Sequence, residues 1–298
     1  MVEVQKITKL TGHKGSIFSL AKRGDQHFIS SGGEGWVVSW DLNNPDPGRL
    51  VAKVDSNLFS VYIDGETIIA GDMNGGIHWV DIQNNSSIDL ALHRNGVFGI
   101  FRLGDWIYSL GGSGYLSRSH IQNPRSQESL QLSHMSLRSI QMISDDTAAI
   151  GASNGNIYFV NLNEMSMINM IENAHDNSVF ALGLDNKTKM LWSGGRDAQI
   201  NIWNLEGDLI NSIPAHMYTV NSLAYLSNHG LMVSGSRDKS IKIWDTTNFR
   251  LIKVIEGMRD GGHLNSVNCL LWTGYKDYLI SGSDDKSICI WRISKSKS

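Results

Sequence analysis

The stretch Ala215–Asp245, AHMYTVNSLAYLSNHGLMVSGSRDKSIKIWD, decides the fold, because the rest of the chain can be aligned to it. Its apolar residues alternate with polar ones in three short runs, a pattern typical of half-buried strands, and NHG and SGSRDKS between the runs are turn sequences. Four residues punctuate it: His216, Ser234, Asp238 and Trp244. A serine hydroxyl can accept the indole N–H of a buried Trp, and an imidazole can join that hydroxyl to a carboxylate. We call this predicted hydrogen-bonded set the relay.

The relay returns at matching spacing in three other repeats. Repeat one has Glu in place of Asp, and repeats five and seven are complete like repeat six. The members are His13, Ser30, Glu34 and Trp40 in repeat one; His175, Ser193, Asp197 and Trp203 in repeat five; His263, Ser281, Asp285 and Trp291 in repeat seven.

Three further repeats are incomplete, with Val80, Ser119 and Val160 at the Trp position. Repeat two lacks the relay, repeat three keeps His93, and repeat four runs through His134. Successive Trp positions are 39 to 47 residues apart. Such a period is typical of one four-stranded unit per repeat, so the sequence predicts seven units.

The chain resembles the WD-repeat β-propeller family over essentially its whole length. The resemblance is carried by Gly12-His13, Gly262-His263, Trp40-Asp41 and Trp244-Asp245, and by SGGRD, SGSRD and SGSDD before the strands that carry Trp. It implies an all-β fold: a seven-bladed β-propeller of four-stranded antiparallel blades, in one domain over residues 1–298.

The resemblance also explains the N-terminal strand. In this family the last strand of each repeat belongs to the blade begun by the previous repeat, and the polar end RISKSKS is too short to complete the last blade. We therefore expect residues 1–10 to be a closing strand, with residues 3–9 pairing beside residues 263–293. The repeats would fill 11–293 and a short polar tail 294–298. Closure of the ring removes an open sheet edge.

Composition excludes several classes of protein. The 298 residues carry a formal net charge of -3, which is not the basic signal of a dedicated nucleic-acid binder. Cys269 and Cys289 fall in strand-like runs, so we expect packed thiols in a reducing, cytoplasmic setting. The N-terminus has no apolar signal region and no run is long enough to cross a membrane, so no membrane association is expected.

Catalysis and metal binding are both disfavoured. The His, Ser and Asp of a relay resemble a hydrolase triad, but that chemistry needs an exposed serine on a strained turn, and no GxSxG motif is present. Recurrence of the set beside a Trp favours a structural role. There is no CxxC or HExxH pattern, and the glycine clusters precede no helix. We expect no catalytic residue, no metal and no cofactor.

One position in each first strand is the candidate for partner binding. It follows a branched apolar residue that points into the blade, so its own side chain points toward the axis or the upper rim. The residues there are Phe18, Phe59, Phe98, Arg138, Phe180, Asn221 and Asn268. The family resemblance implies that this ring lies at the mouth of the central channel, where partner peptides dock.

Two interpretations of the ring stay open. The phenylalanines either pack the inner strands, or grip an apolar or cationic side chain of a partner. Arg196 and Arg237, just before the relay acids, are expected on the same face, where they could neutralise a carboxylate or phosphate. The insertion Glu256–Gly262 is expected at the same rim, either as a recognition loop or as a tolerated insertion.

The sequence thus predicts a non-catalytic scaffold, monomeric by itself, that recruits a protein or peptide at the upper rim and channel mouth. The partner-binding set is Phe18, Phe59, Phe98, Arg138, Phe180, Arg196 and Arg237. One alternative is nucleic-acid or small-ligand binding by the same rim, with the KSKS tail contributing. Another is a propeller-type hydrolase, which the Phe, Arg and Asn at the axial positions disfavour.

Overall fold

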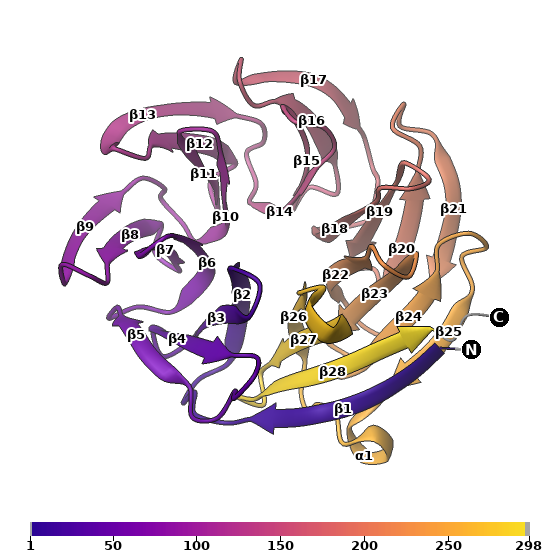
Figure 1. Cartoon of the computed structure of the whole chain (residues 1–298). Coiled ribbons are helices and arrows are strands. Elements are labelled where there is room, and N and C mark those ends of the chain that lie inside the picture. The colour runs from indigo at the N-terminus through magenta and orange to yellow at the C-terminus, as the bar shows by residue number, and fades with distance from the viewer. Residues whose placement is uncertain (1, 296–298) are drawn as a thin grey trace.

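The computed structural model describes residues 2–295 and consists of seven four-stranded antiparallel sheets arranged as blades around a central axis (Figure 1). The predicted all-β, seven-bladed fold is confirmed. In each blade the first strand lies nearest the axis and the fourth lies at the circumference (Figure 1).

The blades follow the repeats in chain order. Blade 1 contains β2 (Ile17–Arg23), β3 (His27–Gly32), β4 (Trp36–Asp41) and β5 (Arg49–Lys53). Blade 2 contains β6 (Leu58–Asp64), β7 (Thr67–Asp72), β8 (Gly76–Asp81) and β9 (Ser86–Ala91). Blade 3 contains β10 (Val97–Leu103), β11 (Trp106–Gly111), β12 (Tyr115–His120) and β13 (Asn123–Gln131). Blade 4 contains β14 (Leu137–Met142), β15 (Thr147–Ala152), β16 (Ile157–Asn161) and β17 (Ser166–Ile171).

The second half of the ring is built in the same way. Blade 5 contains β18 (Val179–Asp185), β19 (Met190–Gly195), β20 (Gln199–Trp203) and β21 (Leu209–Pro214). Blade 6 contains β22 (Val220–Leu226), β23 (Leu231–Ser236), β24 (Ile241–Asp245) and β25 (Leu251–Ile255). Blade 7 contains β26 (Val267–Trp272), β27 (Tyr278–Ser283), β28 (Ile288–Lys295) and β1 (Val2–Leu10).

The hydrophobic core lies between the blades. Alternating apolar side chains on one blade pack against the facing sheet of the next, as where Ile243 of β24 shares a buried cluster with Leu279 of β27. Both side chains are fully buried. Successive side chains of a strand point to opposite faces of its sheet, and each face of a blade packs against a neighbouring blade. Both faces are therefore buried, which explains the near-continuous apolar runs of the inner strands.

The first and last strands close the ring. β1 pairs antiparallel with β28, with Val4 opposite Ile293 and Lys9 opposite Cys289 (Figure 1). The predicted closing strand is therefore confirmed. Residues 294 and 295 of the predicted tail belong to β28, and residues 296–298 lie outside the described part of the chain.

Two further expectations concern cysteines and membranes. Cys269 and Cys289 are both free and buried. No helix within residues 2–295 is long and apolar enough to cross a membrane.

The insertion lies away from the channel. Glu256–Gly262 contains the short helix α1 (Gly257–Asp260), which sits at the circumference near β1 (Figure 1). Lys6 of β1 donates from Nζ to the carbonyl of Gly261 at 3.0 Å, which holds the loop at the outer strand. The insertion therefore lies at the circumference and not at the channel, and its role as a recognition loop at the rim stays a prediction.

Candidate functional site

The relay is a buried hydrogen-bonded chain in blades 5, 6 and 7. In blade 6 the indole N–H of Trp244 donates to Ser234 Oγ at 2.8 Å, and His216 Nε2 lies 2.7 Å from the same oxygen. His216 Nδ1 lies 2.9 Å from a carboxylate oxygen of Asp238. Because the carboxylate accepts the proton at Nδ1, Nε2 is the acceptor for the serine hydroxyl.

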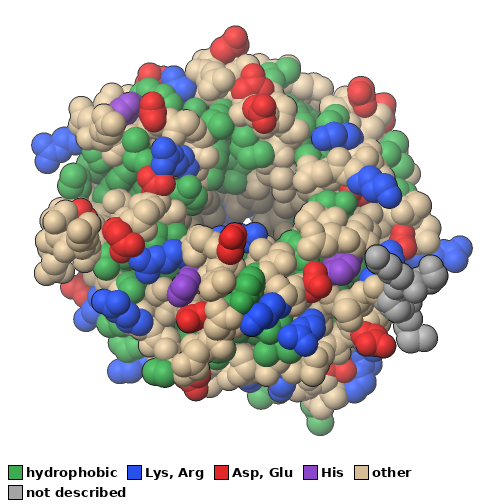
Figure 2. All heavy atoms as spheres, in the orientation of Figure 1, with side chains coloured by type: hydrophobic (Ala, Val, Ile, Leu, Met, Phe, Trp, Pro, Cys, Tyr) green, Lys and Arg blue, Asp and Glu red, His purple; other side chains and the backbone are tan. Residues whose placement is uncertain are grey.

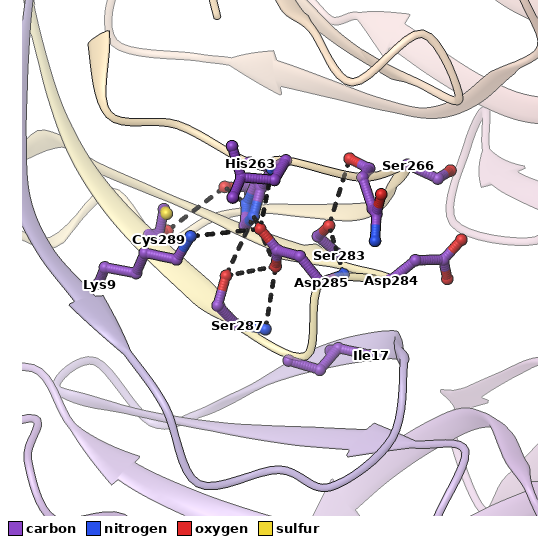
Figure 3. A network of polar contacts seen from close by, with 12 residues as sticks. Lys9, Ile17, His263, Ser266, Ser283, Asp284, Asp285, Ser287 and Cys289 are labelled. Carbon is purple, nitrogen blue, oxygen red and sulfur yellow. Dashed lines mark hydrogen bonds and ion pairs between the residues drawn. The ribbon is translucent and has the colours of Figure 1, made fainter. Parts of the chain in front are cut away.

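Blades 5 and 7 repeat this geometry. The Trp203 indole donates to Ser193 at 2.8 Å, and the Trp291 indole donates to Ser281 at 2.9 Å. In blade 7, Lys9 of the closing strand adds an ion pair to Asp285 at 3.2 Å, so the relay also fastens β1 (Figure 3). The remaining partners are His175 with Ser193 and Asp197, and His263 with Ser281 and Asp285.

The electrostatics of the relay stabilise ionised acids. Burial alone would raise the pKa of Asp238, but hydrogen bonds from His216 and Ser240 outweigh it, and the pKa lies well below its usual range. The side chain of Asp238 is almost buried, and Ser234 is fully buried in the middle of β23. A hydroxyl so enclosed cannot reach a substrate, so the relay is structural and holds the strands of the blade together.

Blades 3 and 4 contain reduced versions. His93 keeps its bond to Ser109 at 2.8 Å, but its buried Nδ1 has no partner among the described residues. In blade 4 Ser133 occupies the position of the relay histidine. Its backbone N–H donates to the carbonyl of Gly114, just as the backbone N–H of His93 donates to the carbonyl of Gly75. His134 is exposed one residue later, so its predicted assignment to the relay position is wrong by one residue.

Blade 2 has a different polar cluster, which the sequence analysis missed. His78 bridges two carboxylates, with N–O distances of 3.1 Å to Asp72 and 2.7 Å to Asp89. Asp72 also accepts the backbone N–H groups of Asn74 and Gly76, each at 2.8 Å. No repeated motif marks this cluster in the sequence, and it appears only when the register of β8 and β9 places His78 opposite Asp89. Within residues 2–295 no three His, Cys, Asp or Glu side chains are placed to hold a metal.

The mouth of the channel is a cavity of about 770 Å³. We define the channel-mouth pocket by its lining, which brings together all seven predicted partner-binding residues: Phe18, Phe59, Phe98, Arg138, Phe180, Arg196 and Arg237. Figure 2 shows the hollow at the centre of the ring, with basic and acidic side chains at its edge. The upper rim is the end of the ring that carries this pocket.

The aromatic residues of the pocket pack on one another. Phe18 meets Phe59 edge-on with ring centroids 5.2 Å apart, and Phe59 stacks on Phe98 at 5.5 Å. The guanidinium of Arg138 then lies 4.0 Å from the centroid of Phe98 and 5.5 Å from that of Phe180. Five neighbouring blades are thus joined by one half-buried arc, which explains much of the phenylalanine pattern by packing.

Asparagines replace the aromatic contacts in blades 6 and 7. Asn221 Nδ2 donates to the carbonyl of Val267 at 2.9 Å, and Asn268 Nδ2 donates to the carbonyl of Ile17 at 3.1 Å. Each bond joins the inner strand of one blade to the next, so these two side chains are occupied in holding the ring. Their amide groups are less available to a partner than the sequence suggested.

Charged groups lie where the arc ends. Arg196 and Arg237 are exposed, and their side chains form no hydrogen bond or ion pair with residues 2–295. Asp284 also lines the pocket and accepts from Asn268 Nδ2 at 2.7 Å. Asp284 was not among the predicted partner-binding residues, although its place in SGSDD matches that of the arginines in SGGRD and SGSRD.

Three stretches of the chain match the family model described as WD domain, G-beta repeat: residues 4–41, 207–245 and 253–292. The chain carries WD repeats in these three stretches and folds as a seven-bladed β-propeller. A solved structure of the WD40 β-propeller domain of Doa1 has the same fold as this propeller, with a TM-score of 0.85 at 20% identity over 100% of this chain and 98% of that one.

Curated relatives of the propeller match over short stretches. A CCR4-associated factor 4 homolog of Vanderwaltozyma polyspora is 29% identical over 38% of this chain and 16% of its own length. The pre-mRNA-splicing factor PRP46 of Candida albicans is 30% identical over 28% of this chain and 22% of its own. The nuclear distribution protein nudF 1 of Talaromyces marneffei is 34% identical over 23% and 15%. The match therefore spans less than a quarter of each relative.

Proposed function

We propose that this propeller is a non-catalytic scaffold that binds a protein or peptide partner in the channel-mouth pocket. The observation that carries the proposal is the pocket itself, a cavity of about 770 Å³ whose wall combines half-buried phenylalanines with exposed arginines. Aromatic residues and arginine are enriched in protein interfaces and dominate their binding energy.

The relatives support an assembly role in general terms. One is named as a factor associated with CCR4, another as a pre-mRNA-splicing factor and a third as a 40 kDa protein of the U5 small nuclear ribonucleoprotein. Membership of such assemblies fits a rigid ring that presents a binding face and performs no chemistry of its own. The enclosed relay serines argue in the same direction, since none is accessible to a substrate.

We also propose a reducing, cytoplasmic location. Burial raises the pKa of Cys269 and of Cys289 to about 12, so neither thiol is prepared for disulfide exchange. Imaging of a fluorescent fusion in the native cell tests the location, and exclusive secretion would contradict it.

The proposed binding is tested by affinity purification of the whole chain from its native cell with quantitative mass spectrometry. One variant combines Phe59→Ala and Phe98→Ala. A second, Gly33→Trp, obstructs the pocket: a Cβ at Gly33 would lie 3.6 Å from the ring of Phe18, an ordinary contact that the backbone accepts. Tyr115→Ala is the control, because Tyr115 is an exposed aromatic on β12 of blade 3.

We expect wild type and Tyr115→Ala to retain the same partners, and both pocket variants to lose them. Thermal denaturation of each variant separates lost binding from lost folding. If folded Gly33→Trp protein retains every partner of the wild type, the channel-mouth pocket is not the binding site.

A further inference from the structure

One turn position of the propeller can be compared across all seven blades. It lies between the second and third strands, and its backbone N–H bonds the carbonyl of the residue just before the first strand, at 2.8 to 3.0 Å wherever the turn occurs. The residues there are Gly33, Met73, Gly112, Ser153, Arg196, Arg237 and Asp284. Charge is therefore confined to three successive blades, with two positive charges followed by one negative.

The two arginines differ from the third arginine of the pocket. Arg138 is half-buried, stacked between two phenylalanines and bonded from Nε to Ser153 Oγ at 2.9 Å. Arg196 and Arg237 are exposed, and no acid within residues 2–295 pairs with either side chain. The neighbouring relay acids Asp197 and Asp238 are engaged by histidines instead. Two unpaired guanidinium groups at one side of a cavity favour an anionic ligand.

Exposed apolar side chains lie beside these arginines. Met217 and Tyr218 are 83% and 59% exposed in the loop that leads into β22. The loop is fixed next to the arginine turn, because Ser236 Oγ donates to the Tyr218 carbonyl at 3.1 Å and the Arg237 N–H donates to the Thr219 carbonyl at 3.0 Å. Tyr, Met and Arg are the residues enriched at the centres of protein interfaces.

We propose that the partner is an acidic peptide segment that lies across blades 5 and 6, with carboxylates paired to Arg196 and Arg237 and an apolar side chain against Tyr218 and Met217. This inference rests on the proposed function and specifies the chemistry of its partner. Asp284 on blade 7 repels a further carboxylate, so the acidic part of the segment points away from that blade. Carboxylates match the planar donor fork of arginine, which can hold them with two parallel bonds.

The test begins with selection of a random peptide display library on the whole chain. We expect enriched sequences to contain at least two Asp or Glu residues next to Leu, Ile or Phe. A selected peptide is then labelled, and its affinity is measured by fluorescence anisotropy beside a twin in which every Asp and Glu is replaced by its amide. The twin is expected to bind on the order of tenfold to a hundredfold more weakly.

The protein variants locate the effect. Arg196→Ala with Arg237→Ala should weaken the acidic peptide as much as the amide twin is weakened, and should leave the twin itself unchanged. Arg125→Ala is the matched control, since Arg125 is exposed on β13 of blade 3, and it should change nothing. Raising the ionic strength should weaken the acidic peptide and not the twin.

Each contrary result has a distinct meaning. Selected peptides without acid enrichment, or acidic peptides indifferent to both arginines, overturn this inference while the proposed function stands, provided that Gly33→Trp still abolishes their binding. An oligothymidylate that displaces the peptide in an arginine-dependent manner also overturns it, in favour of nucleic acid. Peptides that bind Gly33→Trp as well as wild type and are also indifferent to both arginines refute the channel-mouth site itself. A library that yields no binder contradicts both proposals.

Discussion

The guanidinium of Arg138 stacks on the ring of Phe98 at 4.0 Å, so a residue expected to face a partner is held by the propeller itself. Arg138 also contacts Phe180 and bonds Ser153, and therefore ties blades 3, 4 and 5 together. We expect Arg138→Ala to lower the free energy of unfolding by about 1 to 2 kcal/mol, from the lost cation–π contacts and packing. Urea denaturation measures it, with exposed Arg125→Ala as control; equal stability of the two variants would show that the stack contributes nothing.

The shared hydroxyl of a relay carries a second prediction. Ser234→Ala leaves the indole of Trp244 and the imidazole of His216 without their common partner inside the blade. We expect it to lower the free energy of unfolding by roughly 1 to 3 kcal/mol, the cost of buried polar groups left unpaired. Ser227→Ala, at an exposed position of the same blade, is the control. If Ser234→Ala is as stable as Ser227→Ala in urea denaturation, the relay does not stabilise the blade.

The incomplete relay of blade 3 predicts a pH dependence. Burial lowers the pKa of His93 from 6.5 to about 4, so the folded state prefers the neutral imidazole. Between these two pH values the unfolded chain binds more protons, and stability must therefore rise with pH and level off above about 6.5. A shift of this size lowers the free energy of unfolding by about 3 kcal/mol as the pH falls from neutral to about 4.

The measurement is urea denaturation at several pH values between about 4 and 7. The variant His93→Gln keeps a polar group near Ser109 and removes the titration, so its stability should change less over this range than that of the wild type. Parallel curves for the two proteins would place the pH dependence elsewhere, for example in His216, whose pKa burial also lowers.

The fold and the relay could be predicted because the same residues recur along one chain at fixed spacing. Four occurrences of His, Ser, acid and Trp, ending in Trp40, Trp203, Trp244 and Trp291, fix the register of the strands in blades 1, 5, 6 and 7. The alternation of apolar residues gave the correct direction of the channel-facing side chains for the same reason.

Contacts between blades could not be predicted in this way. Phe18 and Phe59 are far apart in sequence, and whether they touch depends on the angle between blades, which no spacing records. The position of the insertion depends on the bond between Lys6 and Gly261, from opposite ends of the chain. His134 was misplaced because it is the histidine next to the relay position, whereas the spacing of four residues between that position and the first strand, as from His93 to Val97, points to Ser133.

The acid missing from blade 3 carries the last prediction. Ser113 occupies the place that Asp197 has in blade 5: each follows two residues after a glycine whose added Cβ would meet the relay histidine, 2.1 Å from His93 at Gly111 and 2.4 Å from His175 at Gly195. Ser113→Asp should therefore bring a carboxylate to the unpartnered Nδ1 of His93 and complete the chain to Ser109.

We expect Ser113→Asp to raise the free energy of unfolding by about 1 kcal/mol at neutral pH, since a buried donor gains an ionised acceptor. The carboxylate also favours the imidazolium, so the pKa of His93 should rise and the loss of stability between pH 6.5 and about 4 should shrink. Ser113→Asn is the matched control, because it offers a hydrogen bond without the charge. If Ser113→Asp and Ser113→Asn show the same pH profile in urea denaturation, the carboxylate does not reach the histidine and the equivalence of the two blades at this turn fails.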